Sequence, residues 1–188
     1  MAIIETKYFT NRQDWRTWLE SNFETRDDIW LEYPKKETGK KRILYNDAVE
    51  EALCFGWIDT ITKSLNKEVT VQRFCKRRSN VPYSQANKER LKWLLENRQI
   101  HKAVLEDVEK VAKEKFAFPK DIVEKLKTDK RTWDNFQKMS EPYKRIRVAY
   151  VESARKRPAE FEKRLNNFID KTKANKIIKG FGGIEKYY

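Results

Sequence analysis

The residues best suited to bind or convert a small molecule gather around one helix-to-strand join and the two strands that follow it. The stretch "EEALCFGWIDTITKSL" begins as an amphipathic helix and ends as a strand, with Gly56 at the join and Asp59 just behind it. Glycine frees the backbone where a helix must stop. The polar and aromatic side chains expected near this join form a candidate ligand-binding set: Tyr45, Trp57, Asp59, Gln72, Arg73, Arg77, Ser84 and Asn87.

Asp59 and Arg73 are the pair in this set that could do chemistry. A short hairpin around "NKE" brings their strands together, and an arginine–aspartate pair can be bidentate. We expect the two side chains to share one sheet face, within reach of each other. Such a pair could hold an anionic or planar ligand beside Trp57. Alternatively, it only stabilises the hairpin, while Ser84 and Asn87 satisfy amides at a helix end.

The usual signatures of cofactor and metal chemistry are missing. His101 has no second histidine or cysteine at ligand spacing, and it is expected to be a surface or capping residue. The chain has no GxSxG, GxGxxG or GxxxxGK[ST] motif, and the "GFGG" at residues 180–183 follows a helix rather than a strand. We therefore expect no cofactor and no metal.

The two cysteines predict neither a disulfide framework nor a zinc site. Cys54 and Cys75 lie far apart in the chain, without a CxxC motif, and both have aromatic neighbours. We expect both to be reduced, half-buried thiols.

The first part of the chain predicts an α+β arrangement. "TNRQDWRTWLESNF" has a Thr10/Asn11 capping signal and a helical spacing of apolar residues, and a short strand precedes it. "DDIWLEYPKK" alternates as a strand, and Asn46 can cap the helix "DAVEEALCF". Residues 57–65 and 68–77 then predict a hairpin, giving a small antiparallel or mixed sheet with helices.

The remainder predicts helices. Ser84 can cap "SQANKERLKWLLENRQ", and Pro119 suits the first turn of a new helix. We expect an α+β domain over residues 1–117, a helical bundle over residues 118–178 that packs on it, and a tail over residues 179–188 that either frays or docks.

Charge is concentrated toward the carboxyl-terminal part. Of the net +13, residues 118–188 supply +9, from 19 basic and 10 acidic residues. This excess suggests an anionic partner, either a small molecule, a polymer such as nucleic acid, or a membrane surface. Alternatively, it is only a solvated face. In "EPYKRIRVAYVESARKR" we expect Lys144, Arg145 and Arg147 to be free on the surface, with Arg155 at the helix end.

The amino-terminal residues "MAIIETKYFTNRQDW" lack a basic segment followed by an apolar run. No stretch approaches the roughly 18 apolar residues that span a bilayer. We expect a cytoplasmic protein.

Three separated motifs resemble the YdeI/OmpD-associated, or bacteriocin-protection, family. They are "YNDAVEEALCFGWIDT", "QRFCKR" and "YSQAN", and "FPKDIVEKLK…FQKMSEPYKRIRVAYVESARKR" resembles the family's helical carboxyl-terminal segment. The resemblance implies tolerance of bacteriocins and cationic antimicrobial peptides, and association with a porin, with no established reaction. The family positions found here are Tyr45, Glu50, Gly56, Trp57, Asp59, Gln72, Arg73, Ser84 and Asn87.

The chain departs from the family pattern beside the candidate site. Thr60 replaces a glycine after Trp-Ile-Asp, Cys75 and Lys76 replace Thr-Pro, and Tyr83 replaces a tryptophan. Thr60 removes backbone freedom next to Asp59.

Two classes of function remain. The first is a non-catalytic binding or stress-protection protein, which the lack of catalytic motifs favours. The second is a small enzyme that uses Asp59 as a general acid or base and Arg73 to hold an anionic small molecule. Sequence-nonspecific nucleic-acid binding is a third interpretation, and it depends on charge alone.

Overall fold

The computed structural model describes residues 5–180 and 184–188. The chain divides into two compact units, the first formed by Met1–Tyr83 and Arg90–Ala112, and the second by Ser84–Glu89 and Lys113–Tyr188. Each unit has its own buried apolar cluster.

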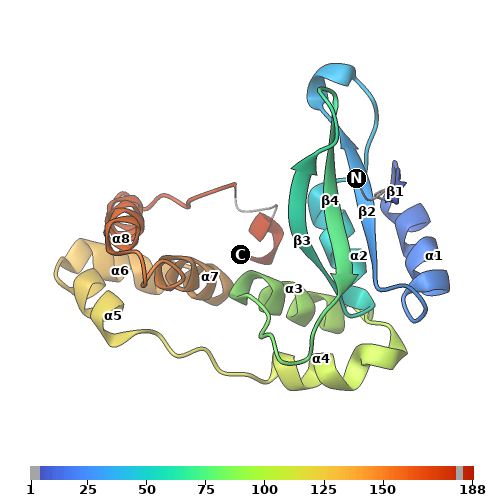
Figure 1. Ribbon diagram of the computed structural model, residues 1–188. Coiled ribbons are helices and arrows are strands. Elements are labelled where there is room, and N and C mark those ends of the chain that lie inside the picture. Colours follow the sequence, from blue (N-terminus) through green and yellow to red (C-terminus); the bar gives the residue numbers. More distant parts are fainter. Residues whose placement is uncertain (1–4, 181–183) are drawn as a thin grey trace. The chain divides into compact units, whose positions relative to one another are not determined.

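The first unit contains a four-stranded mixed sheet, which confirms the predicted α+β class (Figure 1). The strands lie in the order β1-β2-β4-β3, with β1 parallel to β2 and the other pairs antiparallel. Their bounds are β1 Thr6–Lys7, β2 Asp28–Pro34, β3 Trp57–Ser64 and β4 Val69–Lys76. The predicted hairpin is β3–β4.

Helices α1 and α2 pack on one face of this sheet. The helices that the first unit contains or shares are α1 Arg12–Asn22, α2 Tyr45–Cys54, α3 Gln85–Glu96 and α4 Leu105–Ala112, with 3-10 turns at Lys36–Thr38 and Lys102–Val104. Asn11 caps α1 as predicted, because its side chain accepts a hydrogen bond from the Asp14 backbone N–H. Asn46 does not cap α2, which already begins at Tyr45; its amide donates to Glu50 instead.

Aromatic residues fill the core between the two helices and the sheet. Trp15 of α1 is fully buried, lies 5.3 Å from Trp18 between ring centroids, and contacts Phe74 of β4 edge-on. Trp57 of β3 is also fully buried. Large aromatic side chains dominate the burial of apolar surface, so this cluster fixes which sheet face is inside.

Gly56 ends α2 and starts β3. Its φ of +73° is a conformation that L side chains rarely adopt, and a Cβ there would lie 3.1 Å from a Val104 side-chain carbon. Its carbonyl accepts a hydrogen bond from the Arg77 N–H at 3.0 Å. The join therefore needs glycine both for its backbone angle and for close packing.

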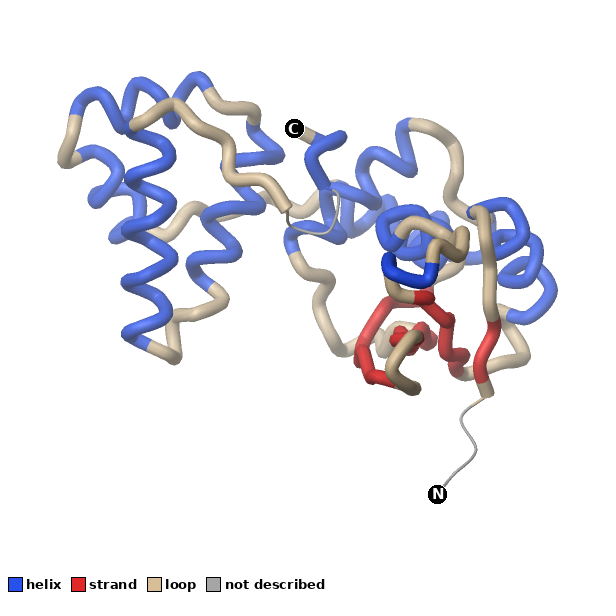
Figure 2. The backbone as a smooth tube through the Cα atoms, turned by 90° about the horizontal axis from the view of Figure 1, so that it is seen from above, coloured by secondary structure: helices blue, strands red, loops and turns tan. Residues whose placement is uncertain are grey.

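The second unit contains helices and loops, as predicted (Figure 2). Its remaining helices are α5 Lys120–Lys127, α6 Lys130–Lys138, α7 Glu141–Glu152 and α8 Pro158–Lys173, with a 3-10 turn at Ile184–Tyr187. Their apolar faces form one cluster that includes Ile122, Phe136 and Phe168.

The tail after α8 is held by α7. The Ile178 N–H donates to the Tyr143 hydroxyl at 3.1 Å, and Arg147 donates to the Ile178 carbonyl at 2.5 Å. In the "GFGG" stretch, residues 181–183 lie outside the described residues.

Candidate functional site

Strand register decides which candidate residues can meet. Asp59 lies opposite Phe74, and Phe74 is one of the residues of the core. Gln72, two residues before Phe74, points to the same face, because side chains alternate along a strand. Arg73 lies between them and points to the other face.

A β-bulge in β3 adds a second polar side chain to the inner face. Asp59 pairs with Phe74 and Thr62 pairs with Gln72, so β3 uses one more residue than β4 over this interval. The extra residue brings Thr62 beside Gln72, and the Thr62 hydroxyl donates to the Gln72 side-chain oxygen. Ile61, which strict alternation would have turned inward, is 50% exposed. The register shifts between Asp59 and Thr62, so the bulge includes Thr60 and Ile61.

Tyr45 and Asp59 are joined by a hydrogen bond. Tyr45 is the first residue of α2, and its hydroxyl donates to Asp59 Oδ2 at 2.6 Å. Partial burial of the phenol, which leaves Tyr45 40% exposed, and then the adjacent Asp59 carboxylate raise the pKa of Tyr45 above its ordinary value. Tyr45 therefore stays protonated at neutral pH and remains a donor.

Tyr33 contributes a hydroxyl without a partner. The residue is 7% exposed, and its oxygen is buried with no hydrogen bond in the described part of the chain. Burial first, then the neighbouring Tyr45 and the charge of Asp59, raise the pKa of the Tyr33 hydroxyl, and the charge of Arg42 opposes them. The Arg42 guanidinium carbon lies 5.8 Å from the Tyr33 ring centroid. A buried hydroxyl left unpaired costs about 1–3 kcal/mol.

These side chains line one open cavity of about 370 Å³, which we call the tyrosine cavity. Its walls come from β2, β3, β4, the start of α2 and the loop before α2. The lining residues are Tyr33, Arg42, Tyr45, Asp59, Thr60, Thr62, Thr70 and Gln72. The tyrosine cavity thus combines two phenols, one carboxylate, one guanidinium and several hydroxyl and amide groups.

Arg73 does not belong to this cavity, and the predicted Asp59–Arg73 pair is wrong. Arg73 Nε donates to Asp28 Oδ2 at 2.8 Å, on the opposite face of the sheet from Asp59. That outer face has its own groove, which Arg73 and Cys75 help to line. Asp59 lies opposite Phe74, and Arg73 is the neighbour of Phe74 on β4, so the Arg73 side chain points to the other face.

Trp57 and Arg77 line a separate cavity of about 310 Å³. Trp57 donates its indole N–H to the Phe23 carbonyl at 3.2 Å. Arg77 stacks over the Tyr83 ring at 4.2 Å and donates to the Val81 carbonyl at 2.5 Å. Both side chains are engaged in holding loops to the core.

Ser84 and Asn87 group with the second unit. The Asn87 backbone N–H donates to Ser84 Oγ at 3.3 Å, so Ser84 caps α3. This agrees with the alternative prediction that Ser84 satisfies an amide at a helix end. Of the eight predicted residues, the tyrosine cavity therefore unites Tyr45, Asp59 and Gln72. The predicted set lacked the other five lining residues, which are Tyr33, Arg42, Thr60, Thr62 and Thr70; the alternation of β2 gave a signal for Tyr33 alone.

The two thiols and the histidine have structural surroundings. Both cysteines are free, Cys54 buried and Cys75 half-buried. Burial raises the pKa of Cys54 to about 12, which keeps its thiol protonated and unreactive. His101 is a capping residue as predicted, because its Nδ1 accepts from the Ala103 N–H at 3.3 Å.

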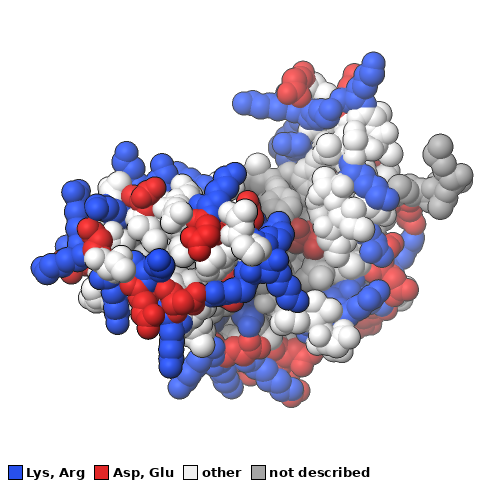
Figure 3. Space-filling model, turned by 60° about the vertical axis from the view of Figure 1, so that its left-hand side comes forward, with Lys and Arg blue, Asp and Glu red and all other residues white. Residues whose placement is uncertain are grey.

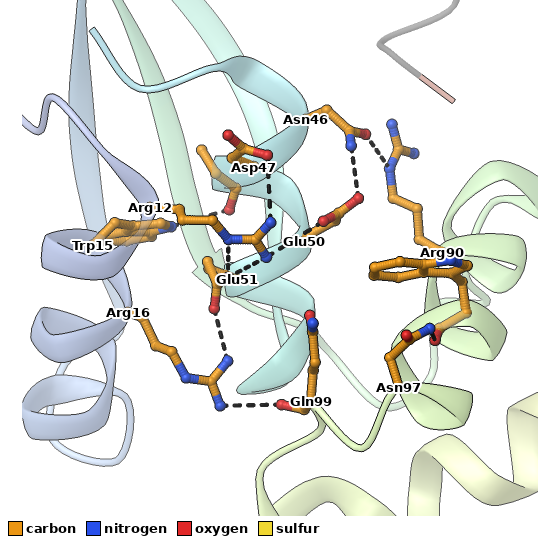
Figure 4. Close-up of polar contacts among 12 residues, drawn as sticks. Arg12, Trp15, Arg16, Asn46, Asp47, Glu50, Glu51, Arg90, Asn97 and Gln99 are labelled. Carbon is orange, nitrogen blue, oxygen red and sulfur yellow. Dashed lines mark hydrogen bonds and ion pairs between the residues drawn. The ribbon is translucent and has the colours of Figure 1, made fainter. Parts of the chain in front are cut away.

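A buried network of charged groups fastens α1 and α2 of the first unit (Figure 4). Glu51 is 2% exposed; it accepts from Arg12 Nε at 2.7 Å and from Arg16 Nη1 at 2.8 Å. No local pattern in the sequence predicted this network.

The same network reaches the start of α2. Arg90 Nε donates to the Asn46 side-chain oxygen at 3.1 Å, and the Asn46 amide donates to Glu50 at 2.7 Å (Figure 4). Because Asn46 follows Tyr45 directly, these contacts fix the helix turn that carries the Tyr45 ring.

The basic side chains of α7 are not free, contrary to expectation. Lys144 is 9% exposed and pairs with Glu141 at 2.5 Å, while Arg147 is 3% exposed. Arg145 makes two hydrogen bonds to Glu89, at 2.7 and 2.8 Å.

Arg155, just beyond α7, is paired as well, with Asp121 at 2.6 Å and with Glu152. On the face drawn in Figure 3, basic and acidic side chains lie side by side. The paired residues therefore offer no ready-made anion-binding surface.

No helix among the described residues is long and apolar enough to cross a membrane.

Two family models match different parts of the chain. Residues 7–107 match a domain of unknown function (DUF8412), and residues 115–175 match the family described as bacteriocin-protection, YdeI or OmpD-associated. The second match confirms the resemblance for the helical segment. No curated protein and no solved structure matches the chain. The chain thus belongs to the DUF8412 family, whose model covers more than half its length, and its residues 115–175 are similar to the YdeI/OmpD-associated bacteriocin-protection family.

Proposed function

We propose that the protein is a non-catalytic binding protein, and that the tyrosine cavity of its first unit holds a small polar molecule. The observation that carries the proposal is Tyr33, which lines the cavity and whose hydroxyl is buried without a hydrogen-bond partner in the described residues. A bound molecule that donates to or accepts from this oxygen would recover the free energy lost by burying it. The Tyr33 hydroxyl would then recognise the ligand through a hydrogen bond.

The description of the family matched by residues 115–175 supports a role in protection against bacteriocins. Direct capture of cationic peptides fits poorly, because a chain of net charge +13 repels them. We propose that ligand binding occurs in the first unit and that the protective role is exercised in the cytoplasm. The family name suggests a porin as a partner.

The rival enzyme hypothesis required Arg73 beside Asp59. Arg73 lies on the other sheet face and pairs with Asp28, so the proposed anion holder is absent from the cavity. Nucleic-acid binding through α7 loses its support in the same way, because Arg145 and Lys144 are paired.

The test is a fragment screen by two-dimensional NMR on the full, isotope-labelled chain, with pools of small polyols, amino acids, amines and carboxylates. We expect at least one pool to shift the amide signals of Tyr33, Tyr45 and Gln72. Tyr33→Phe should weaken that binding about fivefold or more, since a hydrogen bond is worth about 1 kcal/mol. Tyr83→Phe, in the cavity that Trp57 lines, is the matched control and should leave it unchanged. Signals that move only outside the tyrosine cavity, or in no pool at all, would refute the proposal.

A further inference from the structure

The tyrosine cavity is lined by one carboxylate and one guanidinium that do not neutralise each other. Asp59 and Arg42 both line it, and neither makes an ion pair within 4 Å among the described residues. By contrast, Asp28, the strand aspartate on the outer face, is paired with Arg73. Two opposite charges without ionic partners in one cavity suit a ligand that carries both signs.

Each charged group keeps hydrogen-bonding capacity for such a ligand. Tyr45 occupies Oδ2 of Asp59, and a carboxylate has two oxygens that can accept. Arg42 donates Nη1 to the Pro34 carbonyl at 2.8 Å, and a guanidinium has five N–H donors. An ammonium group could therefore bind at Asp59, and a carboxylate could bind at Arg42.

Tyr33 adds a group that can serve either end of the ligand. Its hydroxyl can donate to a carboxylate or accept from an ammonium, and the charges of both Asp59 and Arg42 act on its pKa in opposite directions. A purely anionic ligand would meet the charge of Asp59, and a purely cationic ligand would meet that of Arg42. The like charge should weaken the binding of both kinds of ligand relative to a ligand that carries both signs.

The size of the cavity restricts the ligand further. Its volume of about 370 Å³ lies near the small end of known ligand pockets, which run from roughly 300 to 1,000 Å³. We infer that the tyrosine cavity binds a small zwitterion of the α-amino acid type, its ammonium on Asp59 and its carboxylate on Arg42. This inference rests on the proposed function and narrows its ligand class.

Calorimetric titration of the full chain with the common L-amino acids is the first step of the test. The strongest binder is then compared with its primary amide, which lacks the carboxylate, and with its N-acetyl derivative, which lacks the ammonium. Each derivative should bind about tenfold more weakly or worse, because each loses a charge-assisted hydrogen bond. Xylitol serves as an uncharged probe of similar size.

Two variants test whether Arg42 binds the carboxylate of the ligand and Asp59 binds its ammonium group. Arg42→Gln should weaken the amino acid about tenfold while leaving the affinity for its amide unchanged, because the amide has no carboxylate to lose. Asp59→Asn should weaken the amino acid to a similar degree and leave the N-acetyl derivative unchanged. The matched controls are Arg78→Gln and Asp28→Asn, both outside the tyrosine cavity, and neither should alter any affinity.

The outcomes separate this inference from the proposed function. Binding of xylitol or other neutral fragments in the cavity, without binding of any amino acid, would contradict the inference of a zwitterionic ligand. It would leave the proposed binding function supported. Equal affinities for an amino acid and its amide would contradict the zwitterion inference too. If no probe shifts the amide NMR signals of the cavity residues, both the zwitterion inference and the proposed binding function fail.

Discussion

The hydroxyl of Tyr45 donates to Asp59 Oδ2 at 2.6 Å, which ties the first turn of α2 to β3 at the wall of the tyrosine cavity. We expect this bond to be measurable by a double-mutant cycle of Tyr45→Phe and Asp59→Ala, because alanine leaves no side-chain acceptor for the hydroxyl. The coupling free energy should be about 0.5–1.5 kcal/mol, because Tyr45 is 40% exposed and solvent weakens the bond. Urea unfolding of the four proteins gives the value. A coupling of zero would mean that the two groups do not interact in solution.

Removing the charge of Glu51 should destabilise the first unit strongly. Glu51→Gln leaves Arg12 and Arg16 without their shared buried carboxylate, and breaking such a pair costs about 3–5 kcal/mol. The matched control is Glu20→Gln, which faces Arg16 at 3.7 Å from an exposed position and should change stability by about 0.5 kcal/mol or less. Denaturant unfolding measures both. Equal effects for the two variants would contradict a structural role for the buried network.

Substituting Gly56 should reveal two separate costs. Gly56→Ala forces a side chain into a positive φ and against Val104, so we expect a loss of about 2 kcal/mol or more. Gly39→Ala, at φ +65° with nothing within 4 Å, should cost only the conformational part, about 1 kcal/mol.

Truncating the neighbour tests the contact directly. In a Val104→Ala background, Gly56→Ala should cost no more than Gly39→Ala, because the crowding carbon is gone. An undiminished cost in that background would show that the backbone angle alone requires glycine.

The amino-terminal cap of α6 should make stability depend on acid pH. The backbone N–H of Thr132 binds the Asp129 carboxylate and, with the Thr132 hydroxyl and Lys173, lowers the pKa of Asp129 from 3.8 to about 2. Because the folded-state pKa is depressed, the stabilisation is complete above pH 3.8 and is lost as pH falls through about 2. Asp129→Asn lacks this titration.

Unfolding experiments on wild type and Asp129→Asn between about pH 5 and pH 2.5 test this directly. The stability advantage of the wild type should shrink as the pH falls. A carbon NMR titration of the Asp129 carboxyl should give its midpoint near 2. A midpoint at 3.8, with a constant difference between the two proteins, would rule out the capping bond.

The sequence alone determined the local elements and the class of fold. Alternation in β2 and β4, helical spacing in α1 and α2, and the caps at Asn11 and Ser84 each depend on residues close together in the chain. Gly56 could be placed at a helix end for the same reason, since backbone freedom is a property of the residue itself. Absent motifs likewise limited the chemistry without any coordinates.

Only the tertiary structure decided which side chains meet. One bulged residue in β3 turned Thr62 rather than Ile61 toward Gln72, and the parity of β4 separated Arg73 from Asp59. A shift of one residue reverses the face of every following side chain, so small errors in register exchange whole sites. Arg145 looked free for a similar reason, because its partner Glu89 lies 56 residues away in the chain. Contacts between distant segments form only when packing brings them together, and no local pattern encodes them.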